Sequence, residues 1–236
     1  MLINSYTAKR GFVAIEEMTL RDAGFTIIEN CCAPSECDDI VIQLGTISGP
    51  GTRCLLDDSW CQTLSALLKR RVARAIPEIS SLVAVQCTLF NKSSASNWLV
   101  TFHQDRSIPV APSVVSPTWP GWSQKEGMTF IHGTDELLAQ MVAVRLHVDP
   151  CTSGNGPLRV IPGSHRAGTL SSEAIDDLRE MTDEQQLLVG RGGVVVMRPM
   201  LLHASSKSHT IEARRILHFL FGPKTPPAGL QWRLAV

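Results

Sequence analysis

A histidine and a carboxylate two positions apart, with a second histidine far along the chain, constrain this sequence most strongly: His103, Asp105 and His203. Alternate residues of a β-strand point to the same side, so a strand would let His103 and Asp105 reach one metal ion. His203 then has to arrive on a neighbouring strand, which requires a fold that pairs distant segments. Two imidazoles and one carboxylate form the facial triad that holds non-haem Fe(II) and leaves positions open. The pattern predicts these three residues as iron ligands.

The segment Gly193–His203 supports this prediction, because a His-x-Asp motif alone arises by chance in many proteins. Residues Val195, Met197, Pro199 and Leu201 share one face of an extended segment with His203. We therefore expect a single strand running into the distal histidine. No cysteine stands at matching spacing, which argues against a closed structural zinc site.

Helical patterns come first in the chain and short β-type segments follow. Apolar residues recur at helical spacing over 34–47 and 59–76, and a shorter helix is expected over 172–180. Strands are expected over 82–90, 98–103, 141–148, 158–161, 193–198 and 214–221, with turns rich in Gly, Pro, Ser and Asn between them. This order predicts a mainly β fold with flanking helices, namely a cupin-like jelly roll or double-stranded β-helix. We expect one domain over 1–236, with 1–80 as helical support and 81–236 as the jelly-roll core.

Composition excludes several classes of partner. The formal net charge is +0 and the pI is near 7.0, so nothing favours nucleic acid or an anionic membrane surface. The seven cysteines are odd in number and form no Cys-x-x-Cys, as expected for reduced thiols rather than a disulfide framework. No secretory signal is apparent at the start of the chain. We expect a cytoplasmic monomer or homodimer that acts on a small molecule, with no nucleic-acid or membrane partner.

Several further motifs match one known family. The most specific is Asn155-Gly156-Pro157-Leu158 followed by Pro162-Gly163-Ser164-His165. With the candidate triad and these motifs, the chain resembles the phytanoyl-CoA dioxygenase family of Fe(II)/2-oxoglutarate-dependent oxygenases. The other matching residues are Asn97-Trp98, Phe102–Asp105, Arg145–Asp149, Met197-Arg198-Pro199, His203–Ser206 and Arg214-Arg215.

The resemblance implies the co-substrates and their ligands. Iron would bind 2-oxoglutarate and O2, and the reaction would hydroxylate an unactivated C–H bond with release of succinate and CO2. Arg214 and Ser205 would bind the far carboxylate of 2-oxoglutarate. Arg215 competes with Arg214 for this role, because adjacent strand residues face opposite ways. Halogenating relatives replace the carboxylate ligand with a small residue, so Asp105 favours hydroxylation, although desaturation, epoxidation and rearrangement use the same triad.

The segment 107–138 is rich in proline and weakly periodic, and it follows two candidate iron ligands directly. We expect it to form a mobile wall of the substrate pocket, with Trp119, Trp122 and Arg145 as candidate contacts. The alternative is a surface loop far from the metal. Arg145 and His147 share one face of their strand and look into the barrel only if the other face meets the helices.

Two rival functions remain at this level. One is a cupin-type metalloenzyme with another divalent metal and non-redox chemistry, which would need neither Arg214 nor 2-oxoglutarate. The other is a non-catalytic jelly roll that binds a small molecule. Loss of a triad residue would favour the second, and none is lost here.

Overall fold

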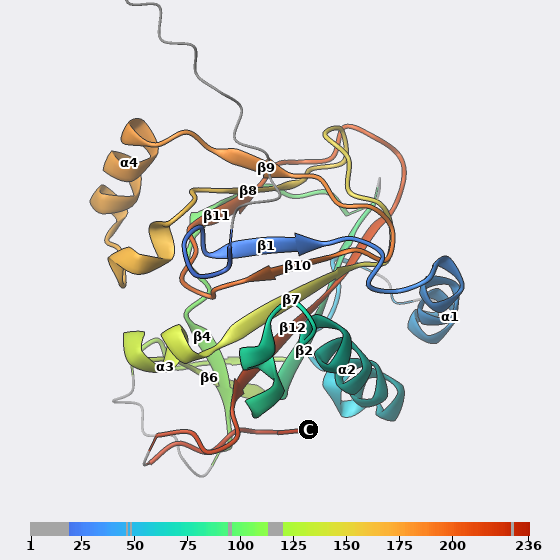
Figure 1. The fold of residues 1–236 in the computed structure, drawn as a ribbon, viewed down its shortest axis with the longest axis horizontal. Helices are drawn as coiled ribbons and strands as arrows, with labels where there is room; N and C mark the ends of the chain where they lie inside the picture. Colours follow the sequence, from blue (N-terminus) through green and yellow to red (C-terminus); the bar gives the residue numbers. More distant parts are fainter. Residues whose placement is uncertain (1–18, 46, 48, 94–95, 113–119, 228) are drawn as a thin grey trace, which may run out of the picture.

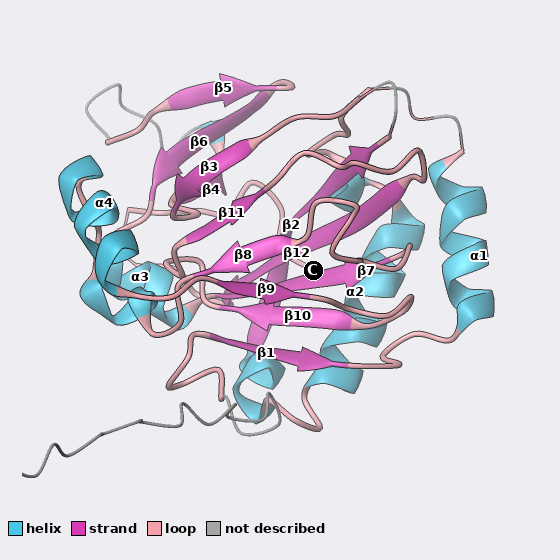
Figure 2. Cartoon of the chain, turned by 90° about the horizontal axis from the view of Figure 1, so that it is seen from above, coloured by secondary structure: helices cyan, strands magenta, loops and turns pink. Residues whose placement is uncertain are grey.

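The computed structural model describes residues 19–236 except 46, 48, 94–95, 113–119 and 228. Two facing antiparallel sheets make up the body, with helices on the outside (Figure 1). A third, smaller sheet lies toward one edge (Figure 2). This is the mainly β architecture with flanking helices that the sequence predicts, so the expected jelly roll is confirmed.

The larger sheet has the strand order β1-β10-β7-β12-β2. Runs of β-branched residues fill its central strands, where their stiff side chains pack well on a pleated surface. The first residue of β12 pairs with the last residue of β2, Arg214 with Lys92. The strands are β1 (Phe25–Ile28), β2 (Leu82–Lys92), β7 (Val142–His147), β10 (Val194–Met197) and β12 (Arg214–Pro223).

The smaller facing sheet has the order β3-β11-β8-β9. Its pairing places His203 of β11 directly opposite His103 of β3. One edge of this sheet therefore brings together two segments that are distant in the sequence. Its strands are β3 (Val100–His103), β8 (Leu158–Val160), β9 (Gln185–Leu187) and β11 (His203–Ser205).

The helices α1 (Pro34–Leu44) and α2 (Ser59–Val72) cover the outer face of the larger sheet (Figure 1). Their apolar residues share one buried cluster with Val144, Leu146 and Val148. Because alternate residues face opposite ways, Arg145 and His147 point between the two sheets. The orientation that the sequence left open is therefore the inward one. Short 3-10 helices occupy Leu55–Asp57, Pro77–Ser81 and Ser164–Ala167.

The segment 107–138 differs from the expected irregular wall. Its described residues, 107–112 and 120–138, form a three-stranded sheet, β4 (Ser107–Val110), β6 (Met128–His132) and β5 (Ser123–Lys125), and continue into α3 (Asp135–Gln140). Glu126 and Gly127 connect β5 to β6 with φ of 52° and 75°, the left-handed pair of a tight hairpin turn. These strands are too short for the periodicity of the segment to show them.

Two other expectations need correction. Gly193–His203 is not one strand: β10 ends at Met197, a turn closed by Leu201 N donating to Arg198 O follows, and His203 opens β11 in the other sheet. Residues 1–80 are not only helical support, since β1 forms an edge of the larger sheet. The expected helix near 172–180 is present as α4 (Ser172–Met181), which lies far from α1 in Figure 1.

All seven cysteines are free thiols, as expected. In the part of the chain that the structure describes, no helix is long and apolar enough to cross a membrane.

Candidate active site

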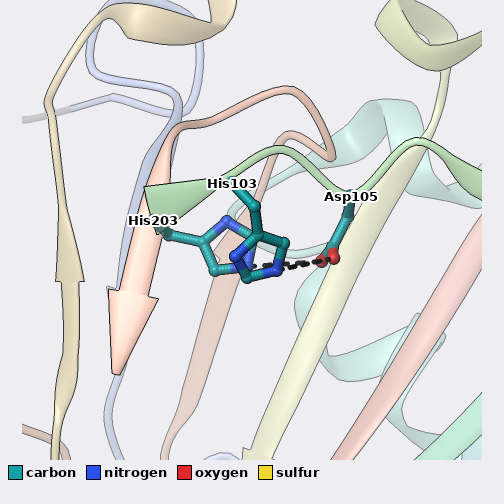
Figure 3. A group of neighbouring side chains, drawn as sticks. All are labelled: His103, Asp105 and His203. Atoms are coloured by element: carbon teal, nitrogen blue, oxygen red, sulfur yellow. Dashed lines mark ion pairs between the residues drawn. The ribbon is translucent and has the colours of Figure 1, made fainter. Parts of the chain in front are cut away.

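The side chains of His103, Asp105 and His203 converge at one edge of the smaller sheet (Figure 3). Each offers a ligand atom, and these atoms lie within 4.8 Å of one another. The Nε2 atoms of His103 and His203 are 3.5 and 3.6 Å from the carboxylate oxygens of Asp105. Three donors so close together are suited to one metal ion with open positions opposite them.

Backbone carbonyls orient both imidazoles. Nδ1 of His103 lies 2.9 Å from the carbonyl oxygen of Thr101, and Nδ1 of His203 lies 2.8 Å from that of Leu201. A ring that donates from Nδ1 keeps its Nε2 lone pair for a metal, which is the usual second hydrogen bond of a metal-binding histidine. Both Nε2 atoms face Asp105, so the tautomer that these bonds favour is the one a metal requires.

Asp105 reaches the site from irregular backbone rather than from the strand, because β3 ends at His103. Its amide donates to Pro199 O at 2.8 Å. Between the two ligands, the side-chain amide of Gln104 donates to the carbonyls of Gly168 and Met200 and accepts from the amide of Leu170. These bonds fix the geometry that strand alternation was expected to supply.

Burial and mutual contact set the protonation of His203 and Asp105. Burial lowers the pKa of His203 to about 4, although Asp105 opposes this shift, so the imidazole is neutral near pH 7. Burial alone would raise the pKa of Asp105, but the neighbouring histidines outweigh it and hold that pKa well below its usual range. A neutral imidazole and an ionised carboxylate are the forms that bind metals.

A small cavity of about 60 Å³ extends from the triad between the two sheets. Arg214, Lys92, Ser205 and Arg145 contribute its polar lining. Arg214 is 3% exposed, and its Nε and Nη1 atoms have no hydrogen-bond partner among the described residues. Arg215 points the other way and pairs with Asp149 through two hydrogen bonds of 2.8 and 2.7 Å. Of the two adjacent arginines, only Arg214 faces the cavity.

Lys92 is a residue of this cavity that the sequence interpretation missed. Its side chain is buried, and Nζ donates to Ser205 Oγ at 2.8 Å and to Ser206 O at 2.5 Å. Burial, followed by the charges of Arg214 and Arg145, lowers the pKa of Lys92 to about 8. The sequence does contain a signal for it. If the expected strand 82–90 continues by two residues, Lys92 points to the same side of the sheet as Phe90.

Arg145 lies in the same cavity and not at an outer wall. Its Nη1 is 3.0 Å from Nδ1 of His218, and its guanidinium lies 5.2 Å from the centre of the Phe90 ring. Nε2 of His218 is in turn 3.7 Å from Asp105. Burial lowers the pKa of Arg145 to about 10, which leaves it charged near pH 7. Arg145 thus connects the triad to the cationic end of the cavity.

Of the other two candidate substrate contacts, the structure describes only Trp122. Trp122 is 42% exposed and lines neither the small cavity nor the larger one beside the triad. Trp119 lies outside the described residues. The segment 107–138 contributes Ser107, Lys125 and Phe130 to the larger cavity instead.

The phytanoyl-CoA dioxygenase (PhyH) family matches residues 20–216 of the chain. No curated protein matches it by sequence. Among solved structures, HygX from Streptomyces hygroscopicus with iron bound is 14% identical, with a TM-score of 0.60 over 87% of this chain and 84% of that one. AviO1 from Streptomyces viridochromogenes Tue57 is 19% identical, with a TM-score of 0.58 over 91% and 96%.

A third similar structure is SnoN, described as a non-heme alpha ketoglutarate dependent epimerase from nogalamycin biosynthesis. It is 13% identical, with a TM-score of 0.62 over 90% of this chain and 83% of that one. At such identities the structural likeness shows the fold alone, whereas the family match spans most of the sequence. The chain therefore belongs to the phytanoyl-CoA dioxygenase family of Fe(II)/2-oxoglutarate-dependent oxygenases.

Proposed function

We propose that this oxygenase hydroxylates an unactivated C–H bond of a small-molecule metabolite. One oxygen atom of O2 enters the product alcohol, and the other enters succinate as 2-oxoglutarate loses CO2. His103, Asp105 and His203 bind Fe(II), which supplies the oxidising chemistry when bound. Arg214 and Ser205 bind the far carboxylate of 2-oxoglutarate, and we add Lys92 to them.

The observation that carries this proposal is the cavity that joins the triad to two buried cations, Lys92 and Arg214. Among the described residues, no carboxylate lies within ion-pair distance of Arg214 or Lys92. An unpaired buried charge costs several kcal/mol, so a site that keeps two of them is suited to an anionic ligand. 2-Oxoglutarate has a carboxylate for this end and a keto acid for the metal end. HygX, which shares the fold, has been solved with nickel and 2-oxoglutarate bound.

Each side chain then has a defined task. The fork of Arg214 can bind a carboxylate bidentately, while the Lys92 ammonium supplies a single strong charge. Ser205 Oγ accepts from Lys92 and donates to Gly156 O at 3.0 Å, which holds the ammonium in place. Arg145 lines the same cavity as Arg214, so we propose that it orients 2-oxoglutarate or Asp105 rather than the substrate.

The same arrangement weighs against the rival functions. A cupin-type enzyme with non-redox chemistry would gain nothing from two buried cations beside its metal. A binding protein would not need both imidazoles held in the metal-binding tautomer. Asp105 fills the third ligand position and leaves no vacancy for a halide, which favours hydroxylation over halogenation.

Anaerobic titration of the metal-free protein with Fe(II) and then 2-oxoglutarate tests the proposal. We expect a visible absorption band once both are bound, and no band with His203→Ala. Screening of metabolites for succinate release would then identify the substrate. A protein that binds Fe(II) but gives neither the band nor succinate would contradict the proposal and favour non-redox chemistry.

A further inference from the structure

A second cavity, about 300 Å³ in volume, meets the first at the triad. The two cavities share Phe90, His103 and Asp105, so a ligand in either would lie beside the metal site. We call the second one the outer cleft. Its volume is at the low end for ligand pockets, which span roughly 300–1,000 Å³. It therefore suits a small molecule.

Three cations line the outer cleft: Arg53, Arg106 and Lys125. The only acidic residue in its lining is Asp105, a proposed iron ligand whose charge the metal would offset. The cations come from the loop before residue 55, the junction of β3 with β4, and the end of β5. Three separate segments therefore bring positive charge to one opening.

Only one of these cations has a carboxylate partner. Arg53 Nη1 donates to Glu126 at 2.8 Å. Within the described ranges, no carboxylate lies at ion-pair distance from Arg106 or Lys125. Burial, and then the charges of Arg106 and Lys125, lower the pKa of His132, which shows that both cations act on the same region. Positive charge in the outer cleft thus exceeds what its own side chains neutralise.

The remaining lining has both polar and apolar character. Phe90, Phe130 and Leu220 supply apolar surface, whereas Gln86 and Thr88 present polar groups that bond each other at 2.9 Å. Such walls fit a small molecule with a hydrocarbon part and a polar end. A substrate amine would meet Arg106 and Lys125 without a counter-charge, so like-charge repulsion disfavours it.

We infer that the outer cleft binds a small substrate carrying a carboxylate or phosphate group, which pairs with Arg106 and Lys125 while a C–H bond faces the iron. This inference rests on the proposed function, because it takes the triad as the reactive end. Charge complementarity at the opening also speeds the capture of an anion by steering its approach.

Matched pairs of small molecules test the inference on the anaerobic Fe(II)- and 2-oxoglutarate-loaded protein. The probes are glucose 6-phosphate with glucose, and hexanoate with hexanamide and hexylamine. Perturbation of the visible band and the shift in melting temperature report binding. We expect only anionic probes to bind, and the comparison of phosphate with carboxylate shows which group the cleft prefers.

The double variant Arg106→Gln/Lys125→Gln should weaken anion binding by about 10-fold or more, as expected for lost bonds to charged groups. Lys224→Gln, outside the outer cleft, is the matched control and should change nothing. Binding of 2-oxoglutarate should be unchanged in both.

Three results would overturn the inference: neutral or cationic probes that bind as well as the anions, anions that bind the double variant unchanged, or no binding by any anion. Failure of the proposed function gives a different result, because the band with 2-oxoglutarate would then be absent before any probe is added.

Discussion

The two cavities that meet at the triad are both cationic, but they are built differently. In the inner cavity, Lys92 and Arg214 project from paired strands of the larger sheet, and both are almost fully buried. In the outer cleft, the cations come from a loop, a strand junction and a peripheral hairpin, and Lys125 is exposed. The cations of the inner cavity are buried in the core, whereas those of the outer cleft lie at its periphery.

This difference suggests that the co-substrate site tolerates little change, whereas the substrate site can vary. A buried cation without a carboxylate partner lowers the free energy of unfolding. The cations of the inner cavity are therefore suited to one class of ligand, an anion that supplies the missing carboxylate. The cations of the outer cleft are half-buried or exposed, which costs less than full burial, and they lie in or next to connecting segments, which tolerate substitution and insertion. A fold of this kind can therefore keep its co-substrate while its substrate varies.

Removal of an iron ligand should have the largest effect, because it disables the point where the cavities meet. We expect His103→Ala and His203→Ala to abolish turnover and to weaken Fe(II) binding strongly. Loss of a residue that only hydrogen-bonds to a metal ligand lowers metal affinity by roughly 10- to 100-fold, and loss of the ligand itself should lower it further. Iron stoichiometry after anaerobic dialysis measures this. Gln104→Ala, which removes bonds around the ligands but no donor atom, should keep part of the iron. Full iron content and activity in the histidine variants would refute the triad.

Substitution of the inner arginine should have the next largest effect. Because a bidentate bond to a carboxylate tolerates lysine poorly, Arg214→Lys should raise the KM for 2-oxoglutarate by roughly 10-fold or more. Arg215→Lys is the matched control, since its side chain pairs with Asp149 on the opposite face. It should leave that KM nearly unchanged, because this side chain points away from the cavity. A large rise only for Arg215→Lys would move the assignment to that residue.

The charge on Lys92 predicts a pH dependence that belongs to the inner cavity. Burial lowers the pKa of Lys92 to about 8, so the ammonium is charged below that pH and lost above it. Only the ammonium attracts a carboxylate, so the KM for 2-oxoglutarate should be flat near pH 7 and rise through pH 8 to 9. One pH unit above a pKa, about a tenth of the group remains protonated, which limits the rise to about 10-fold.

The variant Lys92→Gln separates this effect from other titrations. It should have a higher KM than the wild type at about pH 7, where Lys92 is protonated, and the rise between pH 8 and 9 should disappear. A rise that persists in Lys92→Gln would assign the titration to another group.

The same contrast explains what the sequence predicts and what it does not. Arg214 and Arg215 can be told apart in principle because strand parity fixes their directions, and the core strands are long enough to be recognised. Lys92 was missed because the expected strand ended at Phe90, and only long-range pairing with β12 places it opposite Arg214. The alternation of apolar residues from Val195 to His203 suggests one strand. In the structure a turn at Pro199 and Met200 breaks this segment, and His203 begins a separate strand.

The outer cleft could not be predicted in this way. Nothing local to Arg53, Arg106 or Lys125 marks them as neighbours, since each lies in a short or irregular element. Their association depends on the hairpin turn at Glu126 and on a contact between that turn and a distant loop. Such contacts leave no periodicity in the sequence.

Loss of the contact made by Glu126 should have the smallest effect of these changes. Glu126 accepts hydrogen bonds from Thr52 Oγ1 at 2.6 Å and from the backbone and side chain of Arg53 at 2.9 and 2.8 Å. These bonds fasten the β5–β6 hairpin to the loop that forms the opposite rim of the outer cleft. Glu126→Gln removes the ion pair that holds Arg53. The change also leaves one more unpaired cation in the cleft, but we expect the lost attachment of the rim to outweigh that charge, so the cleft should hold its ligand less firmly.

Because the Arg53–Glu126 pair is about a third exposed or more, we expect only about a 2- to 5-fold rise in the dissociation constant of glucose 6-phosphate, or in the KM of the substrate once known. The KM for 2-oxoglutarate should not change, because the inner cavity shares no bond with this contact. Glu36→Gln is a matched control: it breaks an ion pair of similar exposure with Arg71, between α1 and α2. If Glu126→Gln and Glu36→Gln weaken anion binding equally, the effect reflects general stability. If Glu126→Gln also raises the KM for 2-oxoglutarate, the two cavities are coupled, and the core does not insulate the co-substrate from changes at the substrate end.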